Sequence, residues 1–414
     1  MRVFFKIYIA FFYVFFSCNE DLFKKSYNPP NILWLVAEDQ SPEFFPMYGN
    51  KTISLPNLEK LTKDGIIYTN AYAPVPVCAP SRSALITGMY PSTMGTHNMR
   101  TYNAYKKFNE PSINIPSYSP VVPEGVRMFT EYLRKRGYYC TNNSKEDYNF
   151  KPLANAWDES SGKAHWKNRP EGTPFFSVFN FGITHESQIW KQTNEPLLVD
   201  PNKLKVPPIF PDNPITRKDL AVNYSNLIRL DEQVGSILDE LKSAGLYDNT
   251  LIFFYSDHGG PFPRHKRALY ETGIKVPLII KMPHNKNAQN QEERFVSFID
   301  YAPTLLSFIG IEPPKIMQGK AFLGKYKTPE PNFIFATSDR YDEKVDKLRA
   351  VRYGNYKYIR NFNPTISNAI DVSYREQMPM MKNMRELWES NKLSKNIAQW
   401  FSTPKPEEEL YDIS

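Results

Sequence analysis

Short apolar runs alternate with segments of helical spacing through the first three quarters of the chain. Each apolar run is rich in strand-forming residues and ends in polar ones, which is typical of buried strands in an α/β sheet. Strands are predicted at residues 31–37, 174–182, 250–256 and 276–281, and helices at residues 55–64, 126–136 and 217–244, with one more beginning near residue 81. This order predicts a large, mixed but mostly parallel sheet between helices.

The pattern changes after Pro313 and Pro314. A Tyr-Gly-Asn-Tyr segment at residues 353–356 is flanked by strand-forming residues, which predicts a β-hairpin. We therefore expect residues 18–325 to form the large α/β domain and residues 326–414 to form a small C-terminal antiparallel β subdomain. The length of 414 residues allows both, because a single core stops growing at roughly 250–300 residues.

Residues 1–17 have the composition of a signal peptide. Arg2 and Lys6 give a positive start, and the uncharged run from Ile7 to Phe16 is too short to cross a bilayer as a helix. A buried first strand is the alternative, but a Met-Arg start before a phenylalanine-rich run suits it poorly.

The end of this segment resembles the cleavage box of bacterial lipoproteins. A serine precedes Cys18, and the acidic stretch at residues 19–21 (NED) resembles the surface-export signal of Bacteroidetes lipoproteins. Cys18 is therefore the predicted lipidation site. We expect an exported lipoprotein held in the outer membrane by its lipid anchor, on the cell surface or otherwise facing the periplasm.

Composition excludes several classes of protein. The hydrophobic fraction of 41% and aromatic fraction of 14% exclude a disordered chain. The 51 basic and 44 acidic residues give a net charge of +7 without a Lys/Arg block, so no nucleic-acid partner is expected. Three cysteines are too few for a disulfide scaffold or a four-cysteine zinc site. Of these, Cys140 is expected to be a buried core thiol.

The chemistry is carried by the segment from Val77 to Gly88 (VCAPSRSALITG). It resembles the sulfatase signature C-x-P-S-R-x-x-x-x-T-G at every defining position. The chain thus resembles the formylglycine-dependent sulfatases of the alkaline phosphatase superfamily, especially bacterial polysaccharide sulfatases and heparan N-sulfatases. The resemblance implies an alkaline-phosphatase-like fold and hydrolysis of a sulfate ester.

The same resemblance assigns a modification to Cys78. A formylglycine-generating or anaerobic sulfatase-maturing enzyme would convert Cys78 to formylglycine (3-oxoalanine). The hydrated aldehyde offers a hydroxyl nucleophile, and its second hydroxyl expels sulfate as the hemiacetal collapses. A thiol could not release the product in this way.

Two acidic pairs follow predicted strands and suggest a metal site. Glu38 and Asp39 follow the first strand, where the family commonly has two aspartates, and Asp257 and His258 follow a later one. Parallel strands bring such residues to one edge of a sheet. With the oxygen of the modified Cys78 they form the hard ligand set that the resemblance assigns to one Ca²⁺ ion.

The resemblance assigns further catalytic residues. Arg82, in the signature, offers a fixed fork to hold the nucleophile and the metal ligands. His185, in a Thr-His-Glu segment, would contact sulfate or protonate the leaving oxygen. Lys266 begins the family's second signature and would neutralise sulfate and assist the leaving group.

One segment departs from the family pattern. Lys145 matches the lysine that holds sulfate in the family, but Asp147 stands where a histidine is common. Either Asp147 acts as the base that releases sulfate or another residue does.

Candidate substrate-binding residues lie in polar loops. His97 and Arg100 follow the signature helix, and His165 lies in a later loop; both segments resemble those of polysaccharide sulfatases. Loops held by their own hydrogen bonds explain these residues equally well. The expected substrate is a sulfated polysaccharide or oligosaccharide, either an algal polymer such as ulvan or a glycosaminoglycan.

Two rival functions remain at this point. One is a phosphonate or phosphodiester hydrolase of the same superfamily, which can share the cysteine motif. The other is a non-catalytic surface glycan-binding protein, for which the Asp147 departure is the only support. The sequence has no G-x-S-x-G, H-E-x-x-H or nucleotide-binding glycine motif.

Overall fold

The computed structural model describes residues 29–100, 118–285, 288 and 290–414. Cys18 and the predicted signal segment lie outside the described residues. None of the helices in the described part of the chain is both long and apolar enough to cross a bilayer.

A mixed sheet of nine strands forms the centre of the described structure. Its order is β4-β3-β5-β1-β6-β7-β2-β8, with β9 beside β2. Only β7 runs antiparallel to its neighbours, β6 and β2. The strands are β1 Asn31–Ala37, β2 Ile66–Tyr72, β3 Tyr139–Asn143, β4 Glu159–Ser160, β5 Phe175–Phe181, β6 Thr250–Ser256, β7 Lys275–Lys281, β8 Asn290–Glu292 and β9 Val296–Ser297.

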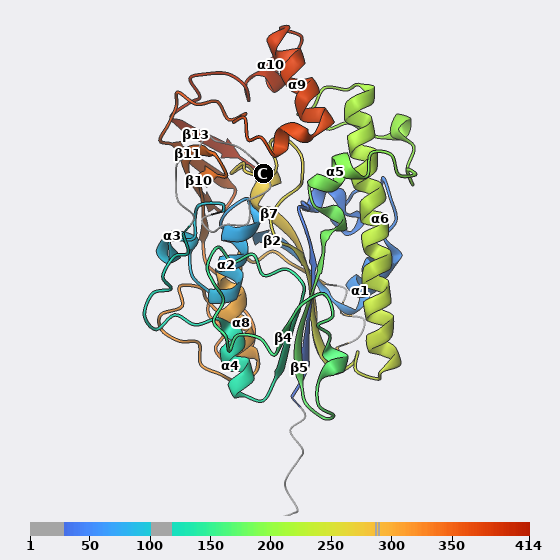
Figure 1. Cartoon of the computed structure of the whole chain (residues 1–414), viewed down its shortest axis with the longest axis vertical. Helices are drawn as coiled ribbons and strands as arrows, with labels where there is room; N and C mark the ends of the chain where they lie inside the picture. The colour runs from blue at the N-terminus through green and yellow to red at the C-terminus, as the bar shows by residue number, and fades with distance from the viewer. Residues whose placement is uncertain (1–28, 101–117, 286–287, 289) are drawn as a thin grey trace, which may run out of the picture.

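Helices cover both faces of this sheet (Figure 1). One face packs against α1 and α6, and the other against α2, α4 and α8. The long helices are α1 Pro56–Asp64, α2 Cys78–Thr87, α4 Phe129–Lys135, α6 Pro214–Ser243, α8 Tyr301–Phe308 and α9 Pro379–Glu389; the short ones are α3 Pro91–Met94, α5 Ser187–Lys191, α7 Glu271–Ile274 and α10 Lys395–Ala398.

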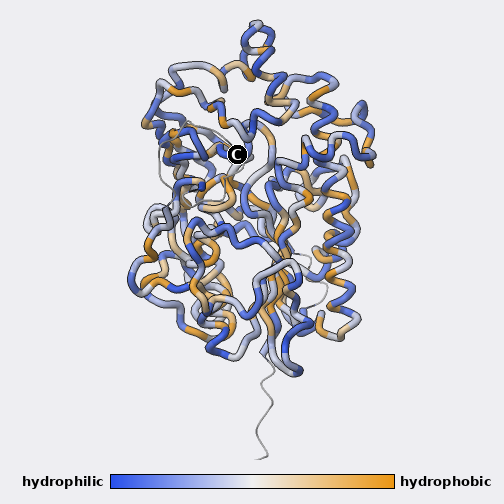
Figure 2. The backbone as a smooth tube through the Cα atoms, viewed as in Figure 1, coloured by the Kyte–Doolittle hydropathy of each residue, from blue (hydrophilic) through white to orange (hydrophobic). Residues whose placement is uncertain are grey.

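The two-sided burial explains why β1 is apolar without interruption. Leu33 and Leu35 pack in the core beneath α6, whereas Ile32, Trp34 and Val36 pack in the core beneath α2, α4 and α8. A strand covered on both faces has no solvent side and therefore no polar alternation. Figure 2 shows apolar residues in the central strands and in the helices beside them.

A second sheet lies toward the C-terminus. Strands β10 Phe333–Tyr341, β11 Lys344–Tyr353, β12 Tyr356–Asn361 and β13 Glu408–Asp412 pair antiparallel in that order. The hairpin expected at residues 353–356 joins β11 and β12, and Gly354 supplies the φ of 50° that this turn requires. The predicted fold class, a large mixed sheet with a small antiparallel one, is confirmed.

Some element boundaries differ from the sequence prediction. The signature helix begins at Cys78, three residues earlier than expected. The longest helix begins at Pro214, because the side chain of Asn213 accepts a hydrogen bond from the Thr216 N–H and caps it. Strand β2 was not predicted, since its sequence (IIYTNAY) mixes apolar and polar residues without strict alternation.

Candidate active site

Three parallel strands end side by side at one edge of the large sheet. Strand β1 lies between β5 and β6, with Ala37 opposite both Phe181 and Ser256. The residues that follow these strands therefore share the same edge. They include Glu38 and Asp39 after β1, His185 after β5, and Asp257 and His258 after β6.

Helix α2 brings Cys78 to this edge. Cys78 is the first helical residue, after an extended Val77, and every residue of α2 is buried. The hydroxyl of Ser81, one turn along, donates a hydrogen bond to the backbone oxygen of Asp257 at 2.6 Å. This bond fixes the start of the helix against the end of β6.

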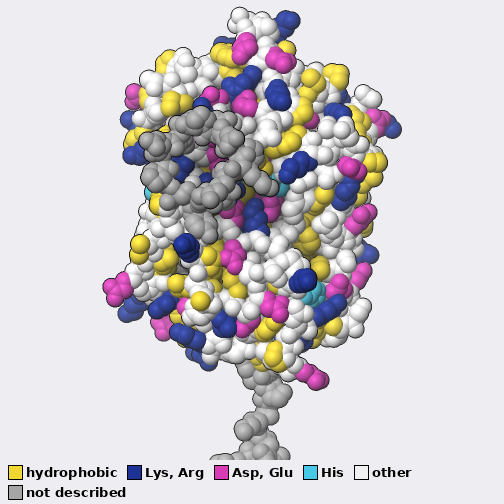
Figure 3. Space-filling model, in the orientation of Figure 1, with side chains coloured by type: hydrophobic (Ala, Val, Ile, Leu, Met, Phe, Trp, Pro, Cys, Tyr) yellow, Lys and Arg dark blue, Asp and Glu magenta, His cyan; other side chains and the backbone are white. Residues whose placement is uncertain are grey.

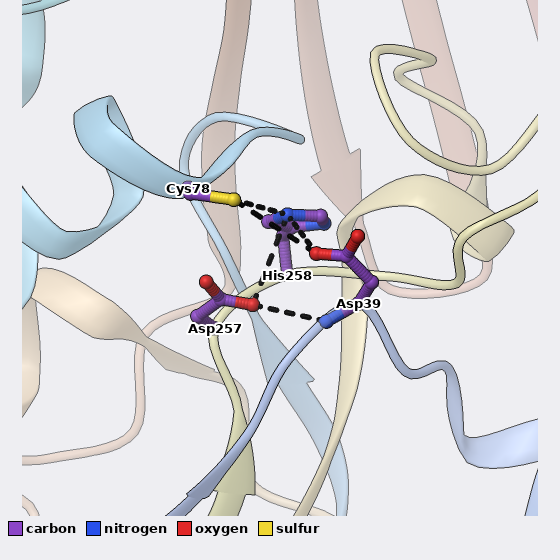
Figure 4. A group of neighbouring side chains, drawn as sticks. All are labelled: Asp39, Cys78, Asp257 and His258. Carbon is purple, nitrogen blue, oxygen red and sulfur yellow. Dashed lines mark hydrogen bonds and ion pairs between the residues drawn. The ribbon is translucent and has the colours of Figure 1, made fainter. Parts of the chain in front are cut away.

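Four buried side chains form a compact cluster there: Asp39, Cys78, Asp257 and His258 (Figure 4). The His258 Nε2 atom lies 2.9 Å from Asp39 Oδ1 and 3.3 Å from Cys78 Sγ. The potential ligand atoms of all four residues lie within 4.8 Å of one another, a spacing at which they could hold a metal ion. The structure thus brings together four of the five predicted metal ligands.

The fifth predicted ligand, Glu38, faces a different set of partners. Its carboxylate lies 3.1 Å from Lys145 Nζ and 3.6 Å from Arg82 Nη2. Two cations therefore already neutralise Glu38. Within the described residues it lies beside the cluster, joined to it through Arg82.

Burial and charge act together on the cluster. Burial opposes ionisation of Asp39, but the nearby Lys266, His185 and His258 hold its pKa well below the usual value. Burial also disfavours a charged His258, yet the carboxylates of Asp257 and Asp39 raise its pKa to about 10. Burial likewise opposes ionisation of Asp257, but His258 and Arg82 lower its pKa, so both aspartates are held as carboxylates, the form that binds a cation.

Lys266 lies at the centre of a second group of polar residues. Its ammonium nitrogen is 2.7 Å from Asp39 Oδ2, 3.2 Å from Glu186 Oε1, and 3.5 Å from both Cys78 Sγ and His185 Nε2. Asp39, His185 and Glu186 have metal-compatible spacing by themselves. The Lys266 ammonium lies among all three, so this group already holds a fixed cation.

The thiol of Cys78 responds to these cations. Burial alone would raise its pKa, but the ammonium groups of Lys145 and Lys266 lower it to about 6. The environment of Cys78 therefore favours negative charge on the atoms that occupy this position.

Arg82 joins the elements around the cluster. Its Nε atom donates to Asp257 Oδ2 at 3.0 Å, and its Nη1 atom donates to Asn180 Oδ1 of β5 at 2.7 Å. Its side chain is buried, and a guanidinium holds two acceptors in a fixed geometry. These contacts link α2 to the ends of β5 and β6.

Asp147 is paired with two cations. It forms a short ion pair with Arg100, and its second oxygen lies 3.8 Å from Lys145 Nζ. Burial opposes its ionisation, but Arg100 and Lys145 lower its pKa below the usual value. Asp147 is therefore a carboxylate at neutral pH, in a position where the family commonly has a titratable histidine.

The predicted substrate-binding residues separate in space. Arg100 forms an ion pair with Asp147, which lies beside Lys145. His97 has a buried Nδ1 atom without a hydrogen-bond partner among the described residues. His165 lies elsewhere, with its Nε2 atom 3.3 Å from Glu240 of α6 and its Nδ1 atom accepting from Lys167 N–H. The structure does not bring His165 to the cluster.

Two residues of the site were not singled out from the sequence. Both carboxylate oxygens of Glu186 accept from the Arg267 guanidinium, and the Glu186 N–H donates to Asp39 Oδ2 at 2.6 Å. The Arg267 N–H donates to the backbone oxygen of Pro76, two residues before Cys78. The only signal in the sequence is that Glu186 and Arg267 adjoin His185 and Lys266.

The remaining cysteine and a further histidine have structural surroundings. Cys140 is a free buried thiol in the core beneath α4, as expected. The His265 ring stacks between Phe44 and Phe210, and its Nε2 atom lies 2.7 Å from Glu43 Oε1.

On the face shown in Figure 3, acidic and basic side chains lie together near the middle of the molecule.

Comparisons with known proteins identify a family. The family model described as "Sulfatase" matches residues 30–175 and 141–311, and the model described as "N-sulphoglucosamine sulphohydrolase, C-terminal" matches residues 260–403. A relative named "Ulvan-active sulfatase", from Formosa agariphila, is 44% identical over 419 residues, covering 92% of this chain and 69% of the relative. Human "N-sulphoglucosamine sulphohydrolase" is 26% identical over 391 residues, covering 84% and 76%.

Solved structures show the same fold. BT1596, described as a 2-O GAG sulfatase, superposes with a TM-score of 0.65 at 18% identity, covering 81% of this chain and 83% of its own. The phosphonate monoester hydrolase of Agrobacterium radiobacter gives a TM-score of 0.62 at 16% identity, covering 88% and 95%. Since both activities occur on this fold, fold similarity does not distinguish them.

Proposed function

The chain belongs to the sulfatase family and is a sulfuric ester hydrolase, and from this premise we propose that it removes sulfate from a sulfated polysaccharide or its oligosaccharides. The observation that carries the proposal is the place of Cys78, which starts α2 within 3.3 Å of His258 and 3.5 Å of Lys266. We propose ulvan as the substrate, since the relative at 44% identity is named for activity on that polymer.

We further propose that Cys78 is converted to formylglycine by a maturation enzyme. The signature around Cys78 supports this modification. The hydrated aldehyde supplies a hydroxyl nucleophile and a second hydroxyl through which sulfate is released. Lys145 and Lys266, which lower the pKa of the present thiol, would favour the ionised nucleophile at the same place.

The proposed metal is one Ca²⁺ ion. Asp39, Asp257 and His258, with the oxygen that replaces the Cys78 sulfur, would hold it. The donor set fits, because both carboxylates are buried and the modification replaces the one soft ligand by a hard one. The cation supplies polarisation of the sulfate.

The residues around the cluster support distinct roles. Lys266 and Lys145 would bind the sulfate oxygens, while His185 would donate a proton to the leaving alcohol. The His185 Nδ1 atom lies 2.9 Å from Ser187 Oγ, which orients the ring so that Nε2 faces Lys266. Asp147, paired with Arg100, would position Lys145 without accepting a proton.

The N-terminal residues support export. We propose that residues 1–17 are removed and that Cys18 carries the lipid, which would hold the enzyme in the outer membrane near its polymeric substrate. A Cys18→Ser variant should leave the membrane fraction, and retention of that variant in membranes would contradict the anchor.

A Cys78 variant tests the activity. The enzyme should be produced with a maturation enzyme, and sulfate release from ulvan oligosaccharides should be compared for the wild type, Cys78→Ala and Cys140→Ala. Only Cys78→Ala should lose activity, and the mass of the wild-type Cys78 peptide should fall by the difference between cysteine and formylglycine. Activity that survived in Cys78→Ala would overturn the mechanism.

The rival chemistry is tested in the same assay. A phosphonate monoester hydrolase shares this fold, so aryl sulfate and aryl phosphodiester should be offered in parallel. We expect faster turnover of the sulfate. A much faster turnover of the phosphodiester would assign the chain to the rival activity.

A further inference from the structure

An open groove lies outside the candidate active site. It encloses about 1090 Å³ between the loop at residues 43–52, the segment at residues 198–209 and Tyr224 of α6. A second hollow of about 780 Å³ shares Glu43, Tyr48, Gly49 and Thr272 with it. The groove is as large as the largest ligand pockets, which measure roughly 300–1,000 Å³, so it has room for an oligosaccharide.

Three lysines give the groove a positive balance of charge. Lys51, Lys203 and Lys205 all line it and are all exposed, and none of them forms an ion pair with the part of the chain that the structure describes. Two acids share the lining: Glu43 Oε1 lies 2.7 Å from His265 Nε2, and Asp200 accepts from Asn202 N–H at 2.9 Å. The lysines outnumber these acids, so the groove would present net positive charge to an anionic ligand.

The lining also offers apolar surface. Leu198 and Val199 contribute to it, with the Leu198 side chain exposed, and the Tyr48 ring lies in the part shared by both hollows. Sugars present apolar C–H faces between their polar edges, so a surface with both apolar side chains and lysines suits a sulfated sugar better than a small inorganic anion.

The groove borders the catalytic loops without containing their reactive groups. Ser41, two residues after Asp39, accepts from Gly260 N–H at 2.6 Å and donates to the Thr272 oxygen at 2.5 Å. On the groove wall, Glu43 Oε1 lies within hydrogen-bond distance, 2.7 Å, of His265 Nε2. His265 precedes Lys266 in the chain. None of the four cluster residues lines either hollow.

We propose that this groove is an accessory site that binds a sulfated stretch of the polysaccharide while another sulfate of the same polymer is hydrolysed. The inference rests on the proposed function. Lysine ammonium groups bind sulfate oxygens as point charges, and three of them along one groove match the repeated charge of a sulfated polymer. The site would raise the affinity for long substrates and leave the reaction on short ones unchanged.

The test compares a triple variant, Lys51→Ala/Lys203→Ala/Lys205→Ala, with a control, Lys60→Ala/Lys392→Ala/Lys395→Ala. The control lysines are also exposed and lie outside both hollows. Sulfate release is measured on ulvan and on a sulfated disaccharide prepared from it. We expect kcat/KM on ulvan to fall roughly tenfold in the groove variant only, with the disaccharide rate unchanged.

Binding is measured separately by calorimetry, with Cys78→Ala protein carrying either set of lysine substitutions. Ulvan should bind roughly tenfold more weakly to the groove variant, and about 0.5 M NaCl should remove the difference. Equal loss on both substrates, no loss on ulvan, or equally tight binding of polyglutamate would overturn the accessory site. If the wild type released sulfate from neither substrate, the proposed function would fail. Calorimetry would still show whether the groove binds ulvan.

Discussion

The Arg267 guanidinium is paired with both carboxylate oxygens of Glu186, at N–O distances of 2.7 and 2.9 Å. One of those oxygens also lies 3.2 Å from the Lys266 ammonium. Burial opposes ionisation of Glu186, but Arg267 and Lys266 lower its pKa to about 2. The pair therefore holds Lys266 toward Asp39 and Cys78.

An Arg267→Lys variant should lose this alignment, because lysine cannot bond both oxygens from a fixed fork. We expect kcat to fall about tenfold while KM changes little, since a misplaced catalytic group affects the transition state more than binding. The matched control is Arg264→Lys, in the same loop, whose guanidinium donates instead to the Asn396 oxygen. Equal losses in both variants would contradict the positioning role.

Asp147 should act as a fixed anion. Its pKa is lowered by Arg100 and Lys145, so it is protonated only below the usual range of aspartate and does not titrate near neutral pH. Asp147→Asn should lower kcat about tenfold and leave the acidic limb of the kcat/KM profile in place. If that limb vanished, Asp147 would be the titrating base. Asp158→Asn, which breaks a pair with Arg134, is the control.

Calcium should stabilise the folded protein through Asp257. Adding Ca²⁺ at about a hundred times its Kd should stabilise by roughly 2.7 kcal/mol and raise Tm by a few degrees. Asp257→Asn should abolish the increase, whereas Asp158→Asn should retain it. Thermal unfolding with Ca²⁺ and with chelator gives the measurement independently of activity. A rise of the same size in Asp257→Asn would place the ion elsewhere.

Asp219 should make stability depend on pH. Burial raises its pKa to about 7, while its carboxylate accepts from Met380 N–H at the start of α9. The folded state therefore binds a proton that the unfolded chain releases near pH 4, so stability falls as pH rises from about 4 to about 7. Asp219→Asn should be more stable than the wild type at pH 8, by up to about 4 kcal/mol, and similar near pH 4.

The control for this prediction is Asp239→Asn, on the same helix. Its side chain is largely exposed and pairs with Lys242, three residues away. The free energy of unfolding of this variant should therefore change between pH 4 and pH 8 by as much as that of the wild type, as measured with denaturant. A pH dependence that persisted in Asp219→Asn would assign the effect to another group.

The sequence determined the main strands and the residues that follow them. The runs that form β1, β5 and β6 are largely apolar because helices cover both faces of the sheet. Each of these strands can therefore be recognised from its own short sequence. Polar residues directly after such runs have to lie at the sheet edge. This position singles out Asp39, Asp257 and His258, the signature singles out Cys78, and the structure brings the four side chains together.

The tertiary structure decided which of these groups meet. Glu38 turns to Lys145 and Arg82, and Asp147 pairs with Arg100 from a different loop. Glu186 and Arg267 join the site only because β5 and the Lys266 loop come together at one edge. The direction of each side chain depends on charges contributed by distant segments, 47 residues away for Asp147 and Arg100 and 81 for Glu186 and Arg267, and no local pattern of the sequence encodes those pairings.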